Sequence, residues 1–171
     1  MATTYVLIAS ANGSGSSGTV TFSSIPQTYT DLFLTASIRD AFNADIYNNL
    51  YIRLNGSTTL DSTVLMLGTG SSTVSTNVNG TGVGLWAPKI STNQAPANTY
   101  ASHEFYIPNY TGSNNKTVGM FGVAENNSTS VQIAAVAGLW RSTSAVTSIT
   151  MYSPNNITTL SSFYLYGIKK N

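Results

Sequence analysis

Asp31-Leu-Phe-Leu-Thr-Ala-Ser-Ile-Arg39 is the stretch that decides the fold. Apolar residues occupy every even position from 32 to 38, while the odd positions are polar apart from Phe33. Successive side chains of a β-strand point to opposite faces of a sheet, so this period of two predicts a strand with one face in the core.

Other stretches repeat this period. Apolar residues at 50, 52 and 54 alternate with Tyr51 and Arg53, and Asn55-Gly56 follows as a turn pair. Residues 131 to 139 alternate as well, and the period of two fits them better than a helix does. The same pattern, bounded by clusters of Gly, Asn, Ser and Pro, predicts further strands at 4–10, 19–23, 62–67, 72–78, 83–87, 100–107, 116–124, 146–152 and 162–169.

Helical patterns are nearly absent, so the chain is predicted to be all-β. About ten or more short strands suggest two antiparallel sheets packed face to face as a β-sandwich. For 171 residues the leading topology is jelly-roll-like, ahead of other Greek-key sandwiches. No repeat, linker or shift in composition divides the chain, so residues 1–171 are predicted to form a single β-sandwich domain.

The composition narrows the class of protein. Hydrophobic residues make up 42% of the chain and charged residues only 8%, against about 25% charged in an ordinary soluble protein. Ten Tyr, six Phe and two Trp argue against a disordered chain. The net charge is +1 and the basic residues are scattered, which makes nucleic acid a poor candidate partner. So few charges suit a chain that packs among neighbouring proteins.

No segment suggests export or a membrane. The chain has no cysteine, so disulfides play no part and folding in a reducing cytoplasm is unhindered. Its first ten residues lack a positively charged leader and contain only a short apolar run. No stretch reaches the length of about 18 apolar residues that a membrane-spanning helix needs. We expect a soluble protein that does not enter a membrane.

Groups that would support catalysis are few. The chain has one His and six carboxylates, and it lacks both a Gly-x-Ser-x-Gly elbow and a phosphate-binding loop. His103 and Glu104 are neighbours in a predicted strand, so they point to opposite faces and cannot pair. We interpret His103 as a solvated or hydrogen-bonded structural residue. With Glu104 and Glu125 as the only glutamates, a glycan-cleaving site is a poor hypothesis, and neither an enzyme nor a cofactor is predicted.

The densest acidic segment is Arg39-Asp-Ala-Phe-Asn-Ala-Asp-Ile-Tyr-Asn-Asn49, between two predicted strands. Its oxygens are of the kind that bind Ca²⁺, but their spacing is irregular and no bidentate Glu closes the loop. Asp and Asn are the usual residues of loops. A polar surface loop is therefore the preferred interpretation, and no metal site is predicted.

Aromatic residues are the stronger candidates for a binding role. Trp86, Trp140 and the tyrosines are flat rings that, when exposed on a face of a sandwich, can stack on sugars. Large rings at alternating positions also serve as core or as subunit interface. The pattern does not decide among these roles.

Four stretches together resemble a known group of proteins: Val20-Thr-Phe-Ser-Ser-Ile-Pro-Gln-Thr-Tyr-Thr-Asp-Leu32, Tyr51-Ile-Arg-Leu-Asn-Gly56, Ile107-Pro-Asn-Tyr110 and Phe163-Tyr-Leu-Tyr-Gly-Ile-Lys169. They are similar to small virion proteins of tailed bacteriophages, which are common in phages of aquatic bacteria. The resemblance covers nearly the whole chain, but its motifs describe strands and turns and carry no chemistry.

This resemblance implies a structural protein, made in the cytoplasm of the bacterial host and displayed on the virion surface. The first hypothesis is a capsid decoration (cement) protein, a homotrimer that contacts the major capsid protein. The alternative is a tail or fibre module that recognises host surface glycans. The candidate glycan or interface aromatics are Trp86, Trp140, Tyr164 and Tyr166.

Two regions are candidate contacts with a neighbouring subunit. One is the N-terminal strand with its Gly-rich loop at 11–18, and the other is the face of Tyr164 and Tyr166 that ends in Lys169-Lys170. Ordinary edge strands with a solvated basic tail would produce the same patterns.

Overall fold

The structure is a computed structural model that describes residues 4–58, 62–68, 73–79, 82–126 and 131–169. Within these ranges the chain is all-β and forms twelve strands without a helix, as the period of two predicted. No helix of the length and apolarity needed to cross a membrane occurs in the described residues. The strands are β1 (Tyr5–Asn12), β2 (Thr19–Phe22), β3 (Asp31–Ile38), β4 (Tyr47–Leu54), β5 (Ser62–Gly68), β6 (Thr73–Asn79), β7 (Leu85–Ser91), β8 (Ala101–Ile107), β9 (Lys116–Ala124), β10 (Gln132–Trp140), β11 (Ile149–Tyr152) and β12 (Ser162–Ile168).

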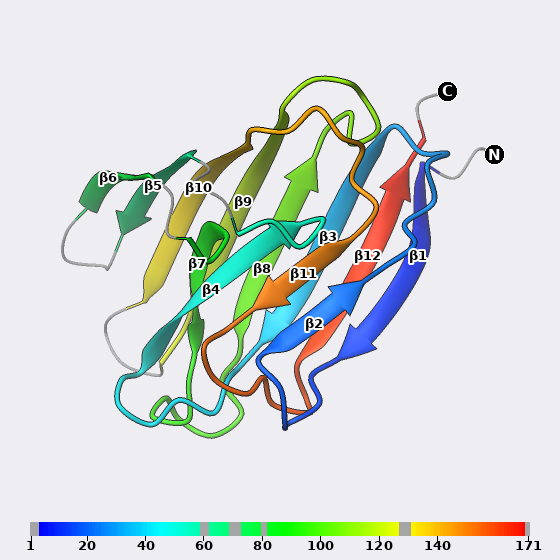
Figure 1. Ribbon diagram of the computed structural model, residues 1–171. Helices are drawn as coiled ribbons and strands as arrows, with labels where there is room; N and C mark the ends of the chain where they lie inside the picture. Colours follow the sequence, from blue (N-terminus) through cyan, green and yellow to red (C-terminus); the bar gives the residue numbers. More distant parts are fainter. Residues whose placement is uncertain (1–3, 59–61, 69–72, 80–81, 127–130, 170–171) are drawn as a thin grey trace.

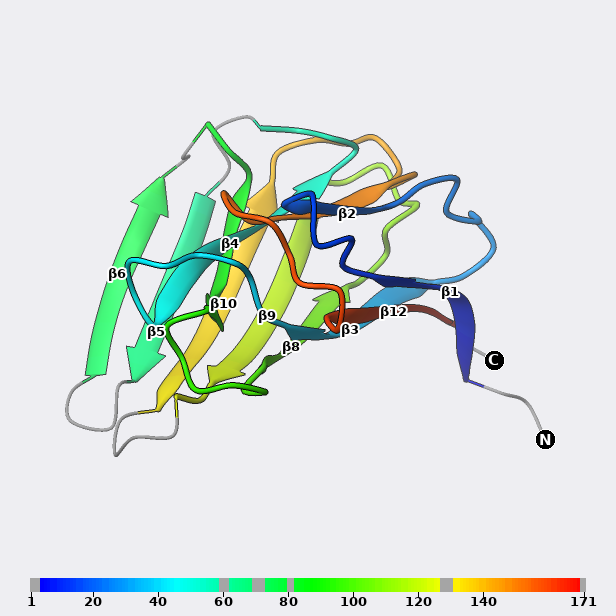
Figure 2. The same cartoon turned by 90° about the horizontal axis from the view of Figure 1, so that it is seen from below.

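The strands form two antiparallel sheets that pack face to face (Figure 1). The large sheet has the order β1-β12-β3-β8-β9-β10-β5-β6, and the small sheet has the order β2-β11-β4-β7. In the view of Figure 2, β2 lies in one layer and β12 and β3 lie in the other. The predicted antiparallel β-sandwich is confirmed.

The strand order is that of a jelly roll. The chain changes sheet at every step except within the hairpin β5–β6 and along β8, β9 and β10, which all belong to the large sheet. Two four-stranded layers result, β1-β12-β3-β8 and β2-β11-β4-β7, as in the eight-stranded jelly roll. The remaining strands are two hairpins, β5–β6 and β9–β10, which extend the large sheet on the side away from the chain ends (Figure 1).

The core lies between the sheets and follows the predicted alternation. Leu32 and Ile38 of β3 and Leu50 and Ile52 of β4 are fully buried. In β8 and in the first seven residues of β9 and β10, buried and exposed residues alternate strictly. Burying a large apolar side chain contributes about 1.5–3 kcal/mol to the free energy of unfolding, so this core is the main source of stability.

The boundaries of some strands differ from the prediction. The strand predicted at 83–87 runs from Leu85 to Ser91 and therefore includes Pro88. A proline has no N–H for a central ladder, but β7 is an edge strand of the small sheet, where proline is tolerated. The strand predicted at 146–152 begins only at Ile149. Residue 72, the first of another predicted strand, lies outside the described residues.

The acidic segment at 39–49 is not simply a polar surface loop, because its first two side chains are buried. The Arg39 guanidinium donates to the carbonyl oxygens of Ala95 and Pro96 at 2.8 and 2.7 Å. The Asp40 carboxylate accepts from Asn48 Nδ2 and Ser153 Oγ, both at 2.6 Å. The charged groups of Arg39 and Asp40 thus bind other loops of the chain. The spacing of residues within the segment does not reveal these contacts. No group of three potential metal-binding His or acidic residues exists in the described part of the chain.

Candidate functional site

The surface that stands out is the outer face of the large sheet, formed by the side chains that point away from the small sheet. Among the residues whose side-chain burial the structure describes, which excludes 59–81, six of the seven exposed large apolar side chains lie on this outer face: Tyr5, Leu7, Tyr106, Phe121, Ile133 and Tyr164. Strand pairing aligns the outward residues of neighbouring strands in rows across the sheet. One such row consists of Leu7, Tyr166, Phe33, Tyr106, Gly119 and Ala137. The rings of Tyr5 and Phe33 meet edge to face with 5.9 Å between centroids.

This outer face carries almost no charge. Among the outward side chains of β1, β12, β3, β8, β9 and β10, Glu104 is the one exposed charged group. A large exposed apolar patch on a folded protein usually marks a surface that another macromolecule or a ligand covers. The outer face is therefore the candidate binding surface.

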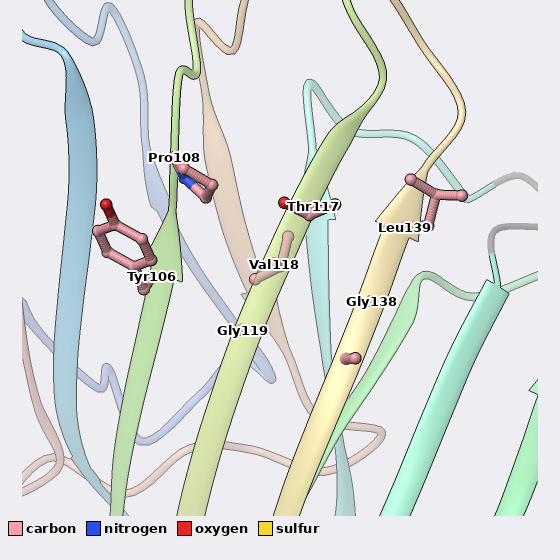
Figure 3. A pocket seen from close by; sticks show the side chains of 8 residues that line it. Tyr106, Pro108, Thr117, Val118, Gly119, Gly138 and Leu139 are labelled. Carbon is pink, nitrogen blue, oxygen red and sulfur yellow. The ribbon is translucent and has the colours of Figure 1, made fainter.

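A depression of about 570 Å³ lies on this face. It is lined by Tyr106, Pro108, Thr117, Val118, Gly119, Ala137, Gly138 and Leu139 (Figure 3). Tyr106 and Leu139 stand on either side of the strand that carries Gly119 (Figure 3).

Gly119 forms the floor of the depression, and nothing in the fold requires a glycine there. Its φ is not in the left-handed region, and a Cβ added to it would meet no atom within 4 Å. By contrast, a Cβ on Gly122 would come within 2.4 Å of Pro88 and one on Gly138 within 2.9 Å of Met120. A glycine inside a strand weakens the strand. Because Gly119 has no side chain, the space above it stays open.

The wall of the depression is rigid because Tyr106 is held in place. Its hydroxyl donates to Asp31 Oδ2 at 2.9 Å, and the other oxygen of that buried carboxylate accepts from the Asn109 N–H at 2.8 Å. The hydrogen bond to Asp31 raises the pKa of Tyr106 above its ordinary value. A second depression of about 220 Å³ lies on the other side of the ring, against Phe33 and Phe121. A wall that is already ordered loses little entropy when a partner binds.

We expect Tyr106→Phe to lower the free energy of unfolding by about 1.5 kcal/mol, because the buried Asp31 carboxylate loses one of its donors. Tyr164→Phe is the matched control, since the two tyrosines share this face and are 40% and 41% exposed. It should change the free energy by less than about 0.5 kcal/mol. Urea unfolding of both variants measures the difference, and equal midpoints would show that the Asp31 bond does not hold the ring.

The four aromatic residues predicted as candidates are not brought together. Tyr164 and Tyr166 lie on the outer face of the large sheet, where they neighbour Thr35 and Phe33. Trp140 is buried in the core, which removes it from any surface. Trp86 is half-buried on the outer face of the small sheet, on the other side of the molecule.

The other regions predicted as candidates show only contacts within the chain or exposed side chains. In the loop at 11–18, the N–H of Gly13 donates to Ser161 O and that of Gly15 to Ile157 O, both at 2.9 Å, so this loop packs on its own chain. Its contact with a neighbouring subunit stays a prediction, as does that of the basic end, of which Lys170 lies outside the described residues. Glu104 and Glu125 are both exposed.

His103 is a buried, hydrogen-bonded residue and not a solvated one. It is 1% exposed, and its Nε2 lies 3.1 Å from Lys89 O. Burial lowers its pKa from 6.5 to about 4, so the ring is neutral at pH 7. As expected, it points away from Glu104.

Sequence reasoning missed Phe33, Tyr106, Gly119 and Phe121 as parts of a site. Phe33 carried a signal, because it is the one apolar residue out of phase in the stretch that decides the fold. Tyr106 is out of phase in the same way, between the inward Phe105 and Ile107. A large apolar residue on the polar phase of a strand is the pattern that would have found this surface.

Comparisons with known proteins do not identify the chain. No family model matches it, and no curated protein or solved structure is detectably similar to it. Its role is therefore inferred from the surfaces described above.

Proposed function

We propose that the protein is a non-enzymatic structural protein of a tailed-phage virion, a decoration protein that lies on the capsid shell. It docks through the outer face of the large sheet. The observation that carries the proposal is this exposed, nearly uncharged aromatic face, with a fixed ring beside an open depression. The resemblance of the chain to small virion proteins supports it. Jelly rolls also occur in viral capsid and lectin domains, although a shared fold alone does not assign a function.

The partner in this proposal is the major capsid protein. An apolar side chain of the shell fills the depression above Gly119, and the surrounding rings exclude water from the contact. Interfaces commonly gain most of their affinity from such an anchor in a central pocket. The proposal includes a homotrimer on the particle surface, which is the assembly that the resemblance implies.

Gly119→Leu tests the docking surface. The new Cβ would meet no atom within 4 Å, and the rest of the side chain would occupy the depression, so the variant should fold with nearly unchanged stability but bind emptied phage heads at least about tenfold more weakly. Thr21→Leu is the control, because it adds the same side chain to an exposed position on the small sheet. Co-sedimentation with heads stripped of the protein measures binding. Wild-type affinity of Gly119→Leu would rule out docking through this depression.

The copy number separates the decoration role from the alternative of a tail or fibre module. A decoration protein is present in hundreds of copies per particle, and quantitative mass spectrometry of purified virions measures this. A number of about a dozen or fewer would exclude decoration and favour the tail.

A further inference from the structure

The outer face of the small sheet carries a second group of rings. Tyr152, Tyr51 and Trp86 stand side by side on β11, β4 and β7, in one row that we call the aromatic row. Their neighbours along the strands, such as Met151 and Ile52, are buried in the core. The aromatic row therefore points outward, on the side of the molecule opposite the docking face proposed above.

The rings of the row lie on adjacent strands and offer mainly carbon to a ligand. Those of Tyr51 and Tyr152 are 6.1 Å apart between centroids and inclined by only 35°. The indole nitrogen of Trp86 is buried, so whatever a ligand reaches of this side chain is carbon. All three residues are partly exposed. Adjacent strands are about 4.8 Å apart, so three positions span roughly 10 Å, the length of about two sugar rings.

Polar groups are placed beside this carbon surface. The Arg53 guanidinium lies over the ring of Tyr152 at 4.0 Å and is held by its Nε, which donates to Val83 O at 2.6 Å. The hydroxyls of Thr21 and Thr150 form a pair at 2.9 Å along the same face. Among the residues of β2, β11, β4 and β7, Arg53 and Lys89 are the charged ones, and both are basic.

We propose that the aromatic row binds an acidic polysaccharide, a glycan that contains uronic acids. The C–H faces of the sugar rings pack on Tyr51 and Trp86, and a carboxylate of the glycan pairs with Arg53, which covers one face of the Tyr152 ring. Flat aromatic surfaces with a few fixed polar groups are the usual means of holding such ligands. The site goes beyond the decoration role, because a protein docked by the large sheet would turn the aromatic row away from the shell. The alternative reading is that these rings serve only as cross-strand pairs that stabilise the sheet.

Titration of the full-length protein with alginate oligosaccharides tests the site, with dextran oligosaccharides of equal length as the neutral comparison. We expect saturable binding of alginate, seen as a change in tryptophan fluorescence and by calorimetry. Tyr51→Ala should weaken it at least about tenfold. Tyr51→Thr keeps a residue that favours strands and should show the same loss if the alanine variant does not fold. Arg53→Met should lose the preference for alginate over dextran.

Phe121→Asp and Gly119→Leu change only the opposite face, so both should bind alginate like the wild type. Failure of shell docking and failure of glycan binding are thereby distinguished. Absence of saturable alginate binding by the wild-type protein would overturn the inference. So would binding that stays within about twofold of wild type in a folded Tyr51 variant, since the rings would then be structural only.

Discussion

Replacing Asp40 with alanine is expected to lower the free energy of unfolding by about 3–5 kcal/mol, the largest effect of any single substitution considered for this protein. The Asp40 carboxylate is fully buried. It accepts from Asn48 Nδ2 and Ser153 Oγ, both at 2.6 Å, and from the Phe42 N–H at 3.1 Å. Alanine leaves these donors without an acceptor, and each buried donor that loses its partner costs about 1–3 kcal/mol.

Asp45→Ala is the control for this effect. Asp45 belongs to the same segment but is exposed, so its loss should cost less than about 0.5 kcal/mol. Asp40→Asn should fall between the two variants, because the amide keeps one acceptor oxygen. Denaturant unfolding followed by circular dichroism gives the three values at pH 7. A loss below about 1 kcal/mol for Asp40→Ala would show that the loops do not depend on the carboxylate.

Acid is expected to destabilise the protein through His103, by about 3 kcal/mol between pH 7 and pH 4. Burial lowers the pKa of this ring to about 4 in the folded protein, while in the unfolded chain it remains near 6.5. Between these values the unfolded state binds more protons than the folded state. Stability is therefore complete above pH 6.5 and falls by about 1.4 kcal/mol per pH unit until the folded protein is protonated near pH 4.

The assignment to His103 is direct because the chain has one histidine. His103→Phe keeps an aromatic ring of similar size in the core but cannot be protonated. Its free energy of unfolding should be flat between pH 5.5 and 7, where carboxylates do not yet titrate. Denaturant unfolding at four pH values in this range measures both slopes. If the variant keeps the slope of the wild-type protein, the acid sensitivity does not come from this residue.

The fold was largely predictable because a strand buried on one side has apolar residues at every second position. The run Asp31–Arg39 and its counterparts alternate between core and surface, and the structure contains a strand at each predicted place among the described residues. The predicted end at 87 was wrong because a proline follows, and its acceptance depends on β7 being an edge strand. The buried Arg39 was missed for a related reason, since its acceptors lie in a loop more than fifty residues away.

The candidate surface was predictable only in part. Tyr164 and Tyr166 were candidates for a glycan or subunit contact, with ordinary edge strands as the alternative, and they lie on the outer face of the large sheet. The fixed ring of Tyr106 and the open space above Gly119 depend on the pairing of β3, β8 and β9. The partner of Tyr106 is Asp31, which is 75 positions away along the chain. The residues next to Tyr106 in the sequence do not indicate that it contacts Asp31.

By itself, then, the sequence determined which side chains of each strand point inward, and with them the two-layered all-β architecture, because alternation along a strand is a local property. Only the tertiary structure decided which of the outward faces is apolar, where a hollow opens between strands, and which charges are buried with partners. These features arise from pairing between segments far apart in the chain, and the hydrophobic period of a single strand contains no information about its neighbours.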